Sequence, residues 1–111
     1  MKVAIIGSRD FDDYNRLKRI LDLYPITLIV SGGARGADYL GEKYAKENNI
    51  PTKIFEAQWD LFGKRAGFLR NSDIIENSDM IFAFWDGESK GTKDSLDKAK
   101  KLKKTTLIAY F

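Results

Sequence analysis

The chain contains neither cysteine nor histidine, and these two absences exclude several kinds of chemistry. Without cysteine there are no disulfides, no thiolate nucleophile and no cysteine metal site. Without histidine the chain lacks the commonest metal ligand and the commonest general base near neutral pH. Any catalysis would therefore use carboxylates, lysine, tyrosine, serine or bound water, and we expect neither a metal nor a cofactor.

Long apolar runs are missing as well. No run reaches the roughly 18 residues that indicate a membrane span, and the six residues before Gly7 are too few for a signal-peptide core. We therefore expect a cytoplasmic protein that does not associate with membranes. A net charge of +3, from 19 basic and 16 acidic residues, is compatible with anionic ligands but too small to indicate nucleic acid.

What is present is a regular alternation of strand and helix patterns along 111 residues, a length that predicts one domain covering 1–111. The predicted strands are Lys2–Ile6, Ile26–Val30, Lys53–Ala57, Met80–Trp85 and Thr105–Phe111. The predicted helices are Tyr14–Tyr24, Gly36–Asn49, Phe62–Asn77 and Thr92–Lys103. This order predicts an α/β fold: a single three-layer Rossmann-like domain, with a five-stranded parallel sheet and helices on both faces.

Three loops at strand ends carry the sequence features that point to a ligand. They are Gly7–Phe11, Ser31–Asp38 and Trp85–Thr92, and they follow the first, second and fourth predicted strands. In open parallel sheets, ligands bind outside the carboxyl ends of the strands. A helix N-terminus offers unpaired N–H groups and partial positive charge, and glycine lets the backbone approach a phosphate closely. The loops therefore predict a phosphate site at this edge of the sheet.

The second loop has the richest glycine pattern, Ser31-Gly-Gly-Ala-Arg-Gly36. It contains part of a dinucleotide fingerprint, but it follows the second strand and has no suitably placed acidic residue about 20 residues later. These differences exclude a standard NAD dehydrogenase. We expect a Cβ at Gly33 to block an approaching phosphate, whereas a ligand-free strand-to-helix turn remains the alternative.

Four motifs together resemble one known group. They are GSRDFDD after the first strand, VSGGARGAD after the second, W…G…AGFLRN along the third helix and AFWDGESKGT after the fourth strand. In this order they resemble the SLOG superfamily, and most closely its small YspA-like branch. The superfamily includes cytokinin-activating phosphoribohydrolases and the DNA-processing protein A domain. The resemblance implies a Rossmann-like fold that binds a nucleotide, a nucleotide-derived signal or, in one branch, single-stranded DNA.

The resemblance also implies roles for particular residues. It puts Gly7, Ser8 and Arg9 at the floor of the pocket, and it puts a phosphate or ribose beside Gly32, Gly33, Gly36 and Asp38. Gly91 and Thr92 are similar to the Gly-Thr helix start of the phosphoribohydrolases. Those enzymes have a catalytic glutamate three residues after the threonine, where this chain has Ser95. This difference argues against carrying the hydrolase activity over to this chain.

Other candidates come from residue type and spacing. Arg35 could hold a phosphate, Arg70 and Asn71 lie on one predicted helix face, and Trp85 could stack on a base. The alternative for Arg35 is a solvated arginine in a loop. For Arg70 and Asn71 it is a surface patch, and for Trp85 it is core packing. For Asp38 the alternative is simple complementation of the helix dipole. The expected ligand-binding residues are Gly7, Ser8, Arg9, Ser31, Gly32, Gly33, Arg35, Gly36, Asp38, Arg70, Asn71, Trp85, Asp86, Lys90, Gly91 and Thr92.

Three functions remain open. The first is binding of a nucleotide or nucleotide-derived small molecule, for sensing or sequestration. The second is hydrolysis of an N-glycosidic or phosphoester bond. Without histidine, Asp38, Asp86, Glu88 or Asp94 would have to activate water, and Asp38 is the catalytic candidate. The third is single-stranded DNA binding, although the low net charge makes nucleic acid an unlikely partner. A homo-oligomer is possible.

Overall fold

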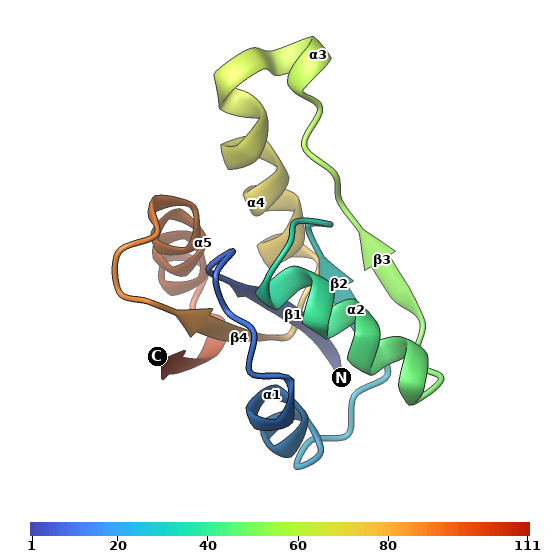
Figure 1. Cartoon of the computed structure of the whole chain (residues 1–111). Coiled ribbons are helices and arrows are strands. Elements are labelled where there is room, and N and C mark those ends of the chain that lie inside the picture. The colour runs from blue at the N-terminus through green and yellow to red at the C-terminus, as the bar shows by residue number, and fades with distance from the viewer.

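Five parallel strands form one sheet in the computed structural model, which describes residues 1–111 (Figure 1). The spatial order is β3 (Thr52–Ile54), β2 (Leu28–Ser31), β1 (Lys2–Gly7), β4 (Met80–Trp85) and β5 (Thr105–Tyr110). The chain runs outward from β1 to β3, then returns to the other side of β1 for β4. The strand order therefore switches between β1 and β4, where a ligand site is expected in an open parallel sheet.

The two central strands are buried on both faces. Successive residues of β1 point to opposite sides, so that Val3 and Ile5 enter one apolar cluster while Ala4 and Ile6 enter another. Ile5 lies opposite Phe82 of β4 in the parallel register. Near-continuous apolar runs are typical of such doubly covered strands.

Four helices form the layers above and below the sheet (Figure 1). On one face, α1 (Tyr14–Leu21) and α2 (Ala37–Glu47) pack over the cluster that contains Phe82. On the other, α4 (Ala66–Glu76) and α5 (Lys90–Lys101) contribute to the second cluster. The predicted three-layer Rossmann-like architecture with a five-stranded parallel sheet is confirmed.

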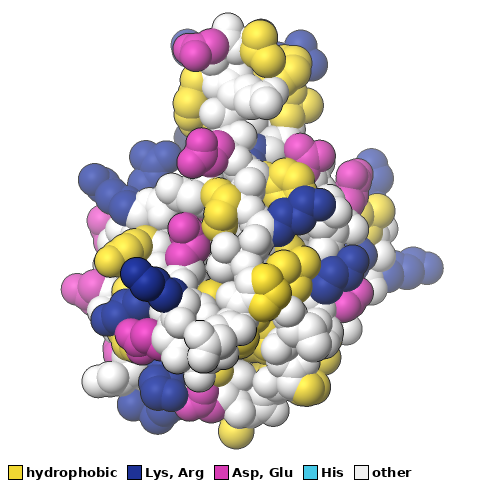
Figure 2. All heavy atoms as spheres, turned by 90° about the vertical axis from the view of Figure 1, so that its right-hand side faces the viewer, with side chains coloured by type: hydrophobic (Ala, Val, Ile, Leu, Met, Phe, Trp, Pro, Cys, Tyr) yellow, Lys and Arg dark blue, Asp and Glu magenta, His cyan; other side chains and the backbone are white.

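The prediction of one helix over Phe62–Asn77 is wrong. The structure has a short helix α3 (Trp59–Phe62), a 3₁₀ turn η1 (Gly63–Arg65) and then α4. Gly63 lies between the first two with φ of +56°, a conformation that favours glycine and that interrupts a right-handed helix. The break lifts α3 beyond the sheet edge, where it forms a narrow protrusion bearing hydrophobic side chains (Figures 1 and 2).

Other element boundaries differ from the predicted ones by a few residues. The first helix ends at Leu21, and the third strand, predicted over Lys53–Ala57, is only Thr52–Ile54. The last helix begins at Lys90, two residues before the predicted Thr92, so that Gly91 lies inside its first turn. No helix combines the length and apolar character needed to cross a membrane.

Candidate functional site

A cleft of about 460 Å³ opens at the carboxyl ends of β1 and β4, beside the switch in strand order. The loops after β1 and β2 form one wall, while α4 and the start of α5 form the other. Its lining is mixed: main-chain atoms and small residues on the floor, with cations and aromatic rings toward the rim. The lining residues are Ile6, Gly7, Ser8, Arg9, Asp10, Ala34, Arg35, Asp38, Trp59, Lys64, Gly67, Phe68, Arg70, Asn71, Ile74, Ser89, Gly91, Thr92 and Ser95.

Close backbone contact joins the first two loops. Gly36 has φ of +78°, and a Cβ built there would lie 2.4 Å from Ser8 O and 2.6 Å from Arg9 Cα. Ala37 N donates to Ser8 O at 3.3 Å across the same contact. Glycine is therefore required at this position for the two loops to approach.

A hydroxyl and carboxylate network joins the first loop to the loop after β4. The buried Ser8 Oγ lies 2.9 Å from Ser89 Oγ and accepts a hydrogen bond from Asp86 N at 3.1 Å. The Asp86 carboxylate in turn accepts from Glu88 N and Ser89 N at 2.9 and 2.8 Å. These backbone donors hold the pKa of Asp86 at about 2. Asp86 thus shapes its own loop.

No side chain of the protein caps the N-terminus of α5. Lys90, Gly91 and Thr92 have backbone N–H groups with no acceptor in the protein, and no side chain caps the helix. Gly91 and Thr92 line the cleft. A Cβ built at Gly91 meets no atom within 4 Å. The first turn of α5 therefore presents free donors and the positive end of the helix dipole to an open space.

Asp38 is the most deeply buried carboxylate at the cleft, with 7% of the residue exposed. Its Oδ2 accepts a hydrogen bond from Ala34 N at 3.3 Å. Burial raises the pKa of the Asp38 carboxyl to about 6, and the N–H group of Ala34 and the charge of Arg70 only partly offset this effect. Near neutral pH, the side chain is therefore an ionised acceptor in a poorly solvated position.

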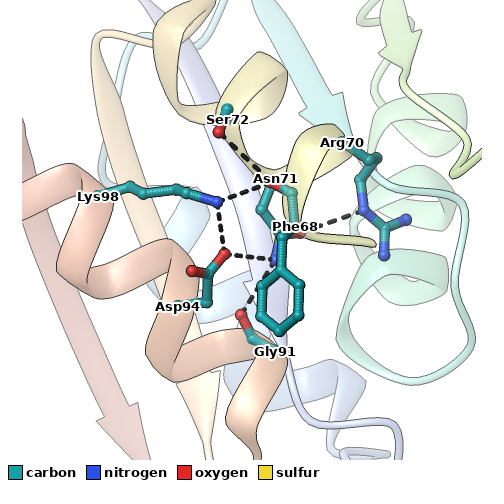
Figure 3. A network of polar contacts seen from close by, with 7 residues as sticks. All are labelled: Phe68, Arg70, Asn71, Ser72, Gly91, Asp94 and Lys98. Atoms are coloured by element: carbon teal, nitrogen blue, oxygen red, sulfur yellow. Dashed lines mark hydrogen bonds and ion pairs between the residues drawn. The ribbon is translucent and has the colours of Figure 1, made fainter. Parts of the chain in front are cut away.

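Arg70 and Asn71 connect both walls of the cleft (Figure 3). Arg70 Nη1 donates to Gly32 O at 2.7 Å, and its Nε donates to Asn71 Oδ1 at 3.1 Å. Asn71 Nδ2 then donates to Gly91 O and to Asp94 Oδ2, at 3.3 and 3.2 Å. The pair thereby ties α4 to the second loop and to the start of α5.

A lysine and a backbone carbonyl extend this network away from the cleft (Figure 3). Lys98 Nζ lies 2.7 Å from both Asp94 Oδ2 and Phe68 O. Asp94 therefore serves as a structural acceptor between two donors. These contacts fix the spacing of α4 and α5, on which the width of the cleft depends.

Cations and aromatic rings gather toward the rim. Arg9, Arg35 and Lys64 line the cleft and take part in no salt bridge. Trp59 and Phe68 also line it and are about half exposed, at 54% and 52%. The opening thus combines positive charge with two half-exposed aromatic side chains.

The structure brings nine of the sequence-predicted site residues to the cleft and leaves seven off its lining. Those that line it are Gly7, Ser8, Arg9, Arg35, Asp38, Arg70, Asn71, Gly91 and Thr92. Those that do not are Ser31, Gly32, Gly33, Gly36, Trp85, Asp86 and Lys90. Several of the second group, including Gly36 and Asp86, instead fix the loop conformations that form the walls.

Gly33 and Trp85 lie in positions that differ from the expected ones. A Cβ at Gly33 would lie 3.2 Å from Ile54 Cγ2, and the residue has φ of +74°. Its missing side chain thus faces β3 and a tight turn, not a phosphate in the cleft. Trp85 packs beside Tyr110 of β5, with ring centroids 5.8 Å apart, on the outer side of α5.

Sequence reasoning did not select several residues that line the cleft. Lys64 and Phe68 arrive there because the break at Gly63 redirects the chain before α4. No periodic pattern marks such a change of direction. Ser89 was detectable in principle, because serine directly before a helix is a common N-cap residue.

Comparison with known proteins assigns the chain to a family. A match to the YspA, cpYpsA-related SLOG family covers residues 1–62, more than half of the chain. The chain belongs to this family. Gene 61 protein of Mycobacterium phage D29 is 34% identical to it, in an alignment that covers 90% of this chain and 89% of the phage protein. The family match over residues 1–62 includes the loops after β1 and β2 of this SLOG protein.

Solved structures of DNA processing protein A have a similar fold. The protein from Streptococcus pneumoniae superposes with a TM-score of 0.82 at 19% identity, over 96% of this chain and 49% of that one. The protein from Helicobacter pylori superposes with a TM-score of 0.75 at 25% identity, over 97% of this chain and 64% of that one. The structure of that protein describes its mode of binding single-stranded DNA. The SLOG chain thus spans about half to two thirds of these relatives.

Proposed function

We propose that this SLOG protein binds a nucleotide or nucleotide-derived ligand in the cleft beside β1 and β4. The observation that carries the proposal is the convergence of a free helix N-terminus, unpaired cations and exposed aromatic rings on one cleft. These are the groups that recognise a phosphate and a base. We propose that the protein senses or sequesters such a ligand.

The phosphate is assigned to the first turn of α5. Three backbone N–H groups there have no protein acceptor, and the open space at Gly91 admits an oxygen atom. Arg9 and Arg35 line the same cleft and supply the balancing charge. A helix N-terminus with nearby cations is a common phosphate site in nucleotide-binding folds.

The sugar and base are assigned to the other two parts of the lining. Asp38 is an acceptor near neutral pH and suits a ribose hydroxyl, which is a hydrogen-bond donor. Trp59 and Phe68 offer ring faces for stacking. The volume of about 460 Å³ falls within the usual 300–1,000 Å³ of small-molecule pockets.

The positions of the carboxylates favour binding over hydrolysis. Asp10 and Asp38 are the only acidic residues that line the cleft. Asp86 accepts hydrogen bonds from its own loop, and Asp94 accepts them from Asn71 and Lys98. A hydrolase mechanism would depend on Asp38, whose carboxylate already accepts from Ala34 N.

Single-stranded nucleic acid is the second candidate ligand for the same cleft. It is favoured by the exposed rings of Trp59 and Phe68 beside cations, which suit stacking and backbone contacts along a strand. The similarity to a DNA processing protein A whose structure describes single-stranded DNA binding supports it too. The expectation that nucleic acid is an unlikely partner is therefore not maintained.

Titration calorimetry with matched ligands tests the proposal. AMP, ADP, ADP-ribose and cyclic mononucleotides should bind, whereas adenosine, which lacks the phosphate, should bind far more weakly. A thymidine oligonucleotide should bind with an affinity that falls steeply with salt if the second candidate applies. The absence of heat from every nucleotide and oligonucleotide at millimolar concentration would refute both.

A further inference from the structure

A second surface lies at the β5 edge of the sheet, on the far side of α5 from the cleft. β5 pairs only with β4, so its other edge has no neighbouring strand. Phe111 N donates to Trp85 O, and in a parallel ladder alternate residues face the same neighbour. The main-chain groups of Thr106, Ile108 and Tyr110 therefore point away from β4.

One side chain already uses this outward direction. Arg16 Nη1 donates to Tyr110 O at 2.7 Å. The outward N–H and C=O groups of Thr106 and Ile108 have no comparable partner in the protein. A short stretch of the edge is therefore free to form backbone hydrogen bonds with another chain.

A groove of about 480 Å³ runs beside this edge, between α5 and the face of β5. Leu96, Trp85 and Ile108 form its apolar part. Ile108 is 37% exposed and the neighbouring Tyr110 is 57% exposed. Helix α5 therefore leaves part of this face of β5 exposed to solvent.

The groove carries an excess of positive charge. Lys93, Lys100, Lys103 and Lys104 line it against a single acid, Asp97. Lys93 pairs with Asp97 at 3.4 Å, and Lys104 Nζ donates to Ser78 O at 2.8 Å. Lys100 and Lys103 take part in no side-chain hydrogen bond or ion pair, so two cations remain available.

This charge argues against a second copy of the chain as the occupant. Pairing two β5 edges would bring the lysines of both copies together, and lysine beside an edge strand disfavours such self-association. An acidic partner would instead gain from the same lysines. The free ladder groups of Thr106 and Ile108 require a polypeptide partner, because nucleic acid provides no regular series of amide donors and acceptors.

We infer that the β5 edge binds an extended acidic segment of another protein, which adds a sixth strand to the sheet. Its backbone pairs with Thr106 and Ile108, and its acidic side chains, which project on the same α5 side of the sheet as Ile108, contact Lys100 and Lys103. This is β-strand addition, a recurring mode of peptide recognition. The surface is separate from the nucleotide cleft and does not depend on the function proposed for it.

The test uses a fluorescein-labelled, capped heptapeptide of alternating glutamate and valine, with fluorescence anisotropy and amide hydrogen exchange as measurements. The peptide should bind to the whole protein and slow exchange at the amides of Thr106 and Ile108. A lysine–valine peptide of the same length should not bind. Unchanged exchange at both amides under saturating peptide would overturn the inference.

Ile108→Pro isolates the backbone contribution. It removes an outward N–H without removing a bond to β4, and proline is tolerated on edge strands in this orientation. Peptide affinity should fall at least about tenfold, whereas Ile108→Val, which keeps the N–H, should change it less than twofold. Equal affinity of the two folded variants would overturn the inference.

A paired lysine variant isolates the charge and does not depend on how well Ile108→Pro folds. Lys100→Gln with Lys103→Gln should weaken peptide binding about tenfold, since an exposed ion pair is worth up to about fivefold. Lys43→Gln with Lys46→Gln on α2 is the matched control and should leave it unchanged. Equal effects of the two lysine pairs on peptide affinity would contradict the proposed surface. So would a thymidine oligonucleotide that binds more tightly than the peptide and whose affinity Ile108→Pro leaves unchanged.

Discussion

Gly91→Val separates ligand binding from folding at the start of α5. Gly91 is the second residue of the helix, its φ is not in the left-handed region, and a Cβ there meets nothing within 4 Å. The Cβ of the new side chain therefore meets no atom of the free protein. Its two methyl groups instead occupy the space beside the free N–H groups of Gly91 and Thr92, where the phosphate is proposed to lie.

Gly91→Val should change stability and nucleotide binding in opposite directions. Valine is a better helix former than glycine by about 0.4 kcal/mol, so the free energy of unfolding should stay equal or rise slightly. Two charge-assisted hydrogen bonds to a phosphate, at about 1.5–3 kcal/mol each, are worth about 3–6 kcal/mol. Nucleotide affinity should therefore fall at least about 100-fold.

Urea unfolding and titration calorimetry of the same preparation measure both quantities. Lys101→Val is the control, because it places valine in the exposed last turn of the same helix, away from the cleft. It should leave nucleotide affinity unchanged. Normal nucleotide binding by a folded Gly91→Val protein would show that the phosphate does not lie at α5.

Three further predictions concern the walls of the cleft. Gly36→Ala should lower the free energy of unfolding in urea by about 2 kcal/mol more than Gly63→Ala. The two glycines have similar φ and ψ, but only Gly36 faces backbone atoms. Equal losses would mean that the loops after β1 and β2 can separate without cost. The pKa of Asp38 is about 6 in the folded protein and about 3.9 in an unfolded chain, so its ionisation should lower the free energy of unfolding by about 2 kcal/mol as pH rises from 4 to 6. Asp38→Asn should remove that part of the pH dependence, and identical pH profiles for both proteins would contradict the buried, ionising carboxyl. Asn71→Ala should cost about 2–3 kcal/mol because it removes hydrogen bonds to Gly91 O and Asp94, whereas Ser72→Ala on the exposed side of α4 should cost less than about 0.5 kcal/mol; similar losses would refute the bridging role.

The fold was predictable because each central strand is a continuous apolar run. The predicted strand Met80–Trp85 has the same bounds as β4 in the structure, because a short, continuous apolar run is typical of a strand that is buried on both faces. The segment around Gly63 was not predictable in the same way. Apolar residues continue through it, and only the positive φ of one glycine divides the pattern into α3 and α4.

The candidate site was predictable at the level of loops, but less so at the level of side chains. The strand-to-helix positions of Ser8, Asp38 and Gly91 brought them to one cleft, as a parallel sheet requires. The direction of a side chain within a loop depends on φ and on packing against neighbouring loops. Gly33 therefore faces β3, although its spacing in the sequence is that of a phosphate loop.

The two tryptophans of the chain divide between the two surfaces. Trp59 lies at the rim of the cleft, and Trp85 lines the groove beside β5. Each surface thus carries its own intrinsic fluorophore. A protein with Trp85→Phe would report optically on the cleft alone, and one with Trp59→Phe on the β5 edge alone. Occupancy of both surfaces could then be followed in separate titrations, without attaching a dye to the protein.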